Sequence, residues 1–173
     1  MLRKFGIIAV LSLIATALAA VPALAVPPTS VTETGGLHVC QGSVLDVTAT
    51  KTDGAFLTAT GEVCGAGPTA TATLTSDVTA TVGCVTPSGS NEPKGLQEVS
   101  ATTTASEEFP TRAGRATFGV STEPITIEDF PDFQCPSPNM TEVLVGNVTF
   151  TNITLTITSQ TGEIVATFAD IDP

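Results

Sequence analysis

The chain has 173 residues, of which 17 are acidic and 6 are basic, and its formal net charge is −11. This charge argues against nucleic acid and against anionic membrane surfaces as partners, because both are bound through basic patches. It leaves cationic partners and calcium ions open. The length is typical of one domain.

Residues 1–25 have the pattern of a signal peptide. Arg3 and Lys4 form a short positive region, an apolar run follows, and Ala23-Leu24-Ala25 matches the small-x-small pattern of a cleavage site. A membrane anchor over residues 5–26 is the alternative, since that stretch is just long enough to span a bilayer. Cleavage would leave 148 residues, in which 4 basic against 17 acidic residues give a net charge of −13. We therefore expect a secreted, extracellular protein with no membrane association after the signal is removed.

The rest of the chain divides into two parts. Residues 26–36, VPPTSVTETGG, are expected to be a flexible N-terminal segment ahead of the first cysteine. We expect residues 37–173 to form a single β-sandwich domain, because apolar and polar residues alternate with a period of two almost everywhere.

The clearest alternation lies in residues 69–84, TATATLTSDVTATVGC, and it predicts a strand with one buried and one wet face. A strand of about sixteen residues would be long, so a turn or bend is expected at Ser76-Asp77. Cys84 lies on the apolar side of the pattern. Its disulfide is therefore expected at or near the core.

Shorter alternating runs predict further strands at residues 45–50, 57–60, 115–120, 125–127, 143–145, 148–157 and 164–168. Within NVTFTNITLTIT the apolar positions change from even to odd, and this slip at Thr151-Asn152 predicts a β-bulge. No amphipathic helix is found. Eight or nine short strands favour an antiparallel, immunoglobulin-like β-sandwich, with a closed barrel as the alternative. Only the architecture is predicted, because the chain has no Trp.

The four cysteines predict two disulfides, which are common in small exported domains. A zinc site is disfavoured, because the cysteines are far apart in sequence and His38 is the one histidine. Three pairings are open in principle. We favour Cys40–Cys64 and Cys84–Cys135, because each closes a loop of modest length.

Catalysis of the Ser–His type would have to use His38, and no GxSxG elbow accompanies it. Both disulfides together leave no free thiol to act as a nucleophile. We therefore expect no enzymatic activity, no catalytic residue and no cofactor.

The segment TEPITIEDFPDFQC supplies a cluster of carboxylates that could serve a glycosidase or bind calcium. Sugar clefts usually carry aromatic platforms, and the chain has no Trp and no Tyr. No calcium loop of the D-x-[DN]-x-[DN]-G type is present. We expect an acidic, solvated loop held by Phe130 and Phe133. Its acids are Glu123, Glu128, Asp129 and Asp132.

Two loops beside cysteines, residues 86–95 and 136–140, are candidates for a rigid inhibitory loop that is presented to a protease. Neither carries the reactive-site signature of an inhibitor family. N-x-[ST] sequons begin at Asn139, Asn147 and Asn152, and we treat them as unmodified, because the leader has a bacterial composition.

The segment CVTPSGSNEPKGLQ, residues 84–97, resembles a C-x-N-x-G-G-N-x-x-P-G-Q motif of small secreted proteins from actinobacteria and related bacteria. The segments TGEVCGAGPTATATLT, CPSPN and VTFTNITLTIT resemble further parts of the same proteins, so the resemblance covers about residues 57–158. The chain departs from the motif at Thr86, where the motif has Asn, and at Ser88 and Ser90.

The resemblance implies that Cys84 pairs with Cys135, because the two cysteines occur together in the family. It implies no activity, since the family is functionally uncharacterised. We expect a secreted, non-enzymatic β-sandwich module with a binding or structural role at the cell envelope or outside the cell. A secreted protease inhibitor and a calcium-dependent adhesion or binding domain are the alternatives. The expected partner is a protein or a cell-wall polymer.

Overall fold

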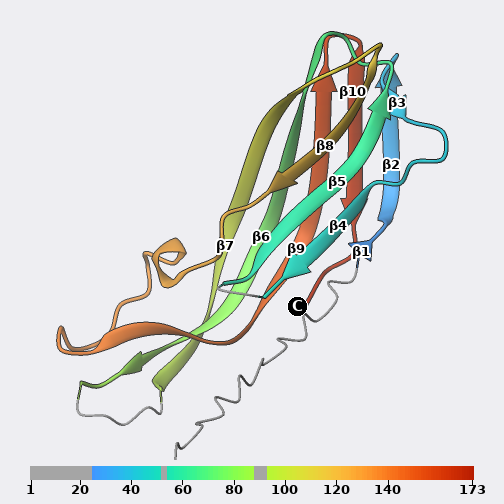
Figure 1. The fold of residues 1–173 in the computed structure, drawn as a ribbon. Coiled ribbons are helices and arrows are strands. Elements are labelled where there is room, and N and C mark those ends of the chain that lie inside the picture. The colour runs from blue at the N-terminus through green and yellow to red at the C-terminus, as the bar shows by residue number, and fades with distance from the viewer. Residues whose placement is uncertain (1–24, 52–53, 88–92) are drawn as a thin grey trace, which may run out of the picture.

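The computed structural model describes residues 25–51, 54–87 and 93–173. These residues form ten β-strands and one short 3-10 helix, and no α-helix occurs among them. The strands pair in an antiparallel sense and make two sheets (Figure 1). The prediction of an all-β, antiparallel fold is confirmed. Of the predicted signal peptide, only Ala25 belongs to the described residues.

Sheet A consists of β1 (Ala25–Val26), β3 (His38–Val39), β4 (Asp46–Thr50), β5 (Phe56–Cys64) and β8 (Arg115–Ser121). Its central strand β5 pairs with β3 and β4 on one side and with β8 on the other, and β1 pairs with β4. The sheet is curled like half of a barrel. Leu57, Ala59 and Val63 of β5 are fully buried, which follows from the alternation in its sequence.

Sheet B has the strand order β2 (Pro28–Gly35), β10 (Gly162–Phe168), β9 (Thr141–Ser159), β6 (Thr69–Val85) and β7 (Lys94–Pro110). The three last-named strands have 17 to 19 residues each. Figure 1 shows that they run well past the end of sheet A, toward the lower left of the view. Where sheet B extends past sheet A, its inner face must therefore be covered by another segment of the protein.

The core lies between the two sheets and contains the apolar residues of each alternating strand. Phe150, Leu74 and Leu155 of sheet B are fully buried. The rings of Phe109 and Phe118 stack with centroids 5.4 Å apart and join β7 to β8. Burial of such side chains supplies the main stabilising term of a domain of this size.

The turn or bend expected at Ser76-Asp77 is absent, because strand β6 runs through both residues without a break. Its length is tolerated, since β7 and β9 are equally long and satisfy its backbone groups on both sides. The bulge predicted at Thr151-Asn152 is confirmed: Asn152 has a φ of 51°, and the pairing with β9 shifts between Thr75 and Asp77. The buried Ser76 hydroxyl donates to the Thr151 carbonyl there, at 2.9 Å.

The expectation of a flexible segment at residues 26–36 is wrong, because most of it forms β2 along one edge of sheet B. Val31 is the one large apolar residue of β2, so the sequence carries no alternating signal. Backbone pairing with β10 and hydroxyl contacts hold the strand instead. The side-chain oxygens of Ser30 and Thr167 are 2.7 Å apart, and the Thr34 hydroxyl donates to the Glu163 carbonyl at 3.2 Å.

Strand β7 is absent from the strands predicted from sequence. Phe109 near its end is its one large buried residue, and the inward-facing residues Val99, Ala101 and Ala105 are only half-buried. The apolar alternation is therefore weak. The strand forms because its neighbour β6 offers a full row of backbone partners, from Thr69 to Cys84.

Candidate functional site

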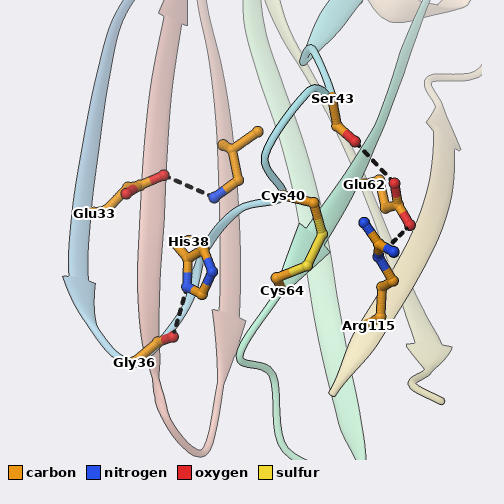
Figure 2. Close-up of a disulfide and its surroundings, with 9 residues drawn as sticks. Glu33, Gly36, His38, Cys40, Ser43, Glu62, Cys64 and Arg115 are labelled. Atoms are coloured by element: carbon orange, nitrogen blue, oxygen red, sulfur yellow. Dashed lines mark hydrogen bonds and ion pairs between the residues drawn. A yellow bond between two sulfur atoms is a disulfide. The ribbon is translucent and has the colours of Figure 1, made fainter. Parts of the chain in front are cut away.

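The first disulfide joins Cys40 and Cys64 beside β3 and β5, with their Cα atoms 5.0 Å apart (Figure 2). His38 lies exposed at this end of the molecule. Its Nδ1 donates to the Gly36 carbonyl at 3.0 Å, so the proton of the ring is used for a backbone contact. This bond orients the ring through the backbone and leaves Nε2 as the nitrogen that a Ser–His site would use.

Glu62 is the centre of a polar cluster at the same end (Figure 2). Its carboxylate accepts the Ser43 hydroxyl at 2.8 Å and pairs with Arg115 Nε at 2.8 Å. Glu33 of β2 reaches across to sheet A, where its carboxylate accepts the Val39 N–H at 2.7 Å. These contacts join separate strands to one another or, at Ser43, a loop to a strand, so we assign them a structural role.

The four acids expected in the acidic loop, Glu123, Glu128, Asp129 and Asp132, are all exposed. The Asp129 carboxylate accepts the N–H of Thr126 at 2.7 Å and its hydroxyl at 3.2 Å, and thereby caps the 3-10 helix η1 (Ile127–Asp129). In the described part of the chain, no group of three or more His, Cys, Asp or Glu residues is arranged to hold a metal ion. No observation therefore favours the calcium hypothesis.

The segment between β8 and β9, residues 122–140, leaves the sheets and is called the excursion below. It begins on sheet A, where the Thr122 N–H donates to the Leu57 carbonyl at 2.9 Å. Phe130 and Phe133 are buried in the core, as expected for anchors of this loop. The second disulfide, Cys84–Cys135, fastens the far part of the excursion to β6, with a Cα–Cα distance of 5.8 Å.

Cys84 is 3% exposed and lies on the inner face of β6, as its place in the alternation predicted. Both disulfides predicted from the sequence are therefore present with the favoured pairing. The second one holds together two loops that are distant in sequence. Lys94 and Gly95, which end the predicted loop at 86–95 and begin β7, line the same hollow of about 250 Å³ as Pro136 and Met140.

A larger, open hollow of about 540 Å³ lies within the excursion and against the start of β9. Two carboxylates face it, from Glu128 and Glu142, and the Glu142 carboxylate also accepts the Cys135 N–H at 3.2 Å. Six of the other lining residues are apolar, whereas polar atoms make up the larger share of the exposed wall. Its apolar residues are Ile127, Phe130, Pro131, Phe133, Pro138 and Met140.

The second candidate loop, residues 136–140, forms a tight turn at the rim of this hollow. The Met140 N–H donates to the Ser137 carbonyl at 3.0 Å. The tip of the other candidate loop, residues 88–92, lies outside the described residues. The three sequon asparagines, Asn139, Asn147 and Asn152, are all exposed.

The hollow was not predicted from the sequence, although its parts were. Glu128, the two buried Phe residues and the loop beside Cys135 were each considered separately, whereas Glu142 was not singled out. The run of prolines at 124, 131, 136 and 138 was the signal for an irregular, covering segment, because Pro excludes central strand and helix positions.

Comparison with known proteins assigns the chain to no family. No family model matches the chain, and no curated protein is significantly similar to it. Among the described residues, no helix has the length and apolar character needed to cross a bilayer.

Proposed function

We propose that the protein is a secreted, non-enzymatic module that binds another protein outside the cell. The observation that carries this proposal is the hollow beside Cys84–Cys135, in which apolar side chains and two carboxylates lie next to a disulfide. A concave surface that combines apolar side chains with a few fixed polar groups is typical of binding sites. Preorganisation by the cross-link lowers the entropic cost of binding.

The charge of the hollow indicates the chemistry of the partner. Glu128 and Glu142 face it, and Asp132 is exposed on the same excursion. With its strongly negative net charge, the protein attracts cations and repels acidic polymers over longer distances. We infer that the occupant is a protein segment with an apolar side chain for the wall and a lysine or arginine for the rim.

The arrangement of polar residues favours binding over catalysis. His38 donates to a backbone carbonyl and lies at the Cys40–Cys64 end of the molecule, whereas the exposed acids lie on the excursion. Asp129 is engaged in capping η1. A catalytic pair would need to converge on one reacting atom, and these residues point to separate structural tasks.

Two disulfides support an extracytoplasmic location, since such bonds persist in oxidising compartments. We propose that residues 1–25 are the signal that takes the protein there. We also propose that the protein is related to the small secreted actinobacterial proteins that it resembles. The cysteines of their motifs correspond to Cys84 and Cys135.

We further propose that the architecture is a variant of the immunoglobulin-like sandwich. In that fold, the next-to-last strand lies between the last strand and a central strand that continues into a hairpin. Here β9 lies between β10 and β6, and β6 forms a hairpin with β7. The departure is β4, which is inserted beside β5. An experimental structure with a different order in sheet B would contradict this assignment.

The proposed binding site is tested by capture from the native culture with immobilised residues 26–173 as bait. The wild type is compared with Glu128→Lys, which reverses a charge at the hollow, and with Glu163→Lys, which makes the same change on exposed β10. We expect Glu128→Lys to reduce capture of a basic protein about fivefold, because about 1 kcal/mol of pairing is lost. We expect Glu163→Lys to leave capture unchanged.

Equal capture by all three baits would overturn the hollow as the site. Capture of a cell-wall polymer in place of a protein would overturn the class of partner. If the captured protein is a protease that the bait inhibits, the module is an inhibitor that acts through this hollow.

A further inference from the structure

Strand β7 forms an exposed edge of sheet B over 17 residues. It pairs with β6 on one side, and no described strand pairs with its other side. The even-numbered residues from 98 to 108 are all exposed. An edge of this kind presents backbone N–H and C=O groups on which a further strand can form.

Natural edge strands are usually protected by lysine, proline, bulges or short length. In β7 such features occur only at the ends. Lys94 and Gly95 precede a register shift at the beginning, and Pro110 ends the strand. Between them, residues 96–108 contain no lysine, arginine, proline or glycine.

Strand β2, at the opposite edge of sheet B, has features that protect an edge strand against the addition of a further strand. Strand β2 has 8 residues, and it starts at Pro28, which has no N–H to offer. Its Glu33 carboxylate is engaged by the Val39 N–H of sheet A. Edge β7 is thus the one of the two that is long and unprotected.

The charges along β7 identify the kind of strand that fits. Glu98 lies near one end, Glu107 and Glu108 lie near the other, and residues 99–106 between them carry no charge. All three acids are exposed. A second copy of the chain would bring carboxylates against carboxylates, because from residue 95 to 111 the strand region has no cation.

We propose that β7 binds an extended segment of another protein by strand addition, and that this segment has basic residues at both ends of an uncharged centre. Backbone hydrogen bonds along residues 99–106 supply the affinity. Pairing with Glu98, Glu107 and Glu108 selects the basic ends and sets the register. This surface shares no residue with the hollow of about 540 Å³ on which the proposed function rests, and each of the two can fail without the other.

The test uses a fluorescent nonapeptide, Lys-Thr-Ser-Thr-Val-Thr-Ser-Thr-Lys, and measures binding to residues 26–173 by anisotropy. Two control peptides carry either Glu at both ends or Pro at the two central Ser positions. The first control has the wrong charge, and the second lacks the two backbone N–H donors of the replaced residues. We expect the basic peptide to bind about tenfold more tightly than either control, and amides within residues 99–106 to exchange more slowly when it is bound.

Protein variants locate the binding to the edge. Ser100→Lys/Thr104→Lys places two lysines on β7, whereas Thr156→Lys/Thr158→Lys places them on the same face of sheet B but on the central strand β9. We expect the first pair to weaken peptide binding at least about tenfold and the second to leave it unchanged. If the β7 lysine variant loses its β-sheet circular dichroism, Glu98→Gln/Glu107→Gln/Glu108→Gln replaces it, with the same expected loss.

Equal affinity for the three peptides, or an equal effect of the two lysine variants, would overturn the proposal. So would a concentration-dependent dimer in sedimentation that Ser100→Lys/Thr104→Lys dissolves, because the occupant of the edge would then be a second copy. Loss of peptide binding in Glu128→Lys alone would assign the peptide to the hollow and would likewise overturn the β7 site.

Discussion

The two disulfides lie in different parts of the fold and stabilise different kinds of structure. Cys40–Cys64 reinforces strands that already pair, since His38 of β3 lies opposite Cys64 of β5. Cys84–Cys135 fastens a segment that has little strand pairing of its own. The same cross-link therefore rigidifies a sheet in one part and shapes an irregular surface in the other, and we expect function in the second part.

The largest expected effect comes from removing the second disulfide. Its 51-residue separation gives a loss of about 4.1 kcal/mol in the free energy of unfolding for Cys84→Ala/Cys135→Ala in the chain-entropy treatment. The excursion should also detach locally, so that partner capture at the hollow is lost. Urea unfolding and the capture assay measure the two effects. Retained capture in a destabilised variant would remove the functional distinction between the two disulfides.

Removal of the first disulfide is the matched comparison. Its 24-residue separation gives a loss of about 3.4 kcal/mol for Cys40→Ala/Cys64→Ala. Because β3 and β5 remain paired, we expect partner capture to persist under conditions where the variant is folded. A loss of capture equal to that of the other double variant would show that both bonds act only through global stability.

A smaller effect is expected from Asp129→Ala at the excursion. The change removes the carboxylate that accepts the Thr126 N–H and hydroxyl, and a lost cap of this kind costs about 1 kcal/mol. Asp132→Ala, on the same segment, serves as the control and should cost less than about 0.5 kcal/mol. The free energy of unfolding in urea measures both, and equal values would argue against a capping role.

The smallest effect is expected at the Cys40–Cys64 end, from Arg115→Ala. Its ion pair with Glu62 is 2.8 Å long, but the Arg115 side chain is 56% exposed. We expect a loss of about 0.5 kcal/mol at low ionic strength that largely disappears in 1 M salt, because exposed pairs are screened. Arg112→Ala is the matched control for the lost positive charge. A salt-independent loss in Arg115→Ala would assign its contribution to packing.

The strands with alternating large apolar residues were predictable, and the strands without them were not. The pattern at residues 69–84 and the phase slip at Asn152 each report on burial, so β6 and the bulge of β9 follow from them. Strands β2 and β7 bury little, and they form because a neighbouring strand satisfies their backbone groups. Such pairing depends on residues distant in sequence and leaves no local period.

The candidate site likewise has parts that were predictable from the sequence and parts that were not. Cys135, the acids of the excursion and the buried Phe130 and Phe133 were all identified from sequence. Their arrangement around one hollow was not, because it depends on where the cross-link to Cys84 draws the excursion. The exposed edge of β7 could not be predicted from the sequence either, since a strand must be placed in a sheet before its unpaired side is known.

The sequence by itself determined the all-β fold, the core-facing position of Cys84 and the acidic character of the surface. Each follows from local alternation or from composition, which need no knowledge of neighbours. Only the tertiary structure decided which strands form edges, which loops meet, and that acids and apolar side chains share one hollow. The reason is physical: a side chain is placed by its own strand, whereas a binding surface is made by segments that long-range pairing and cross-links bring together.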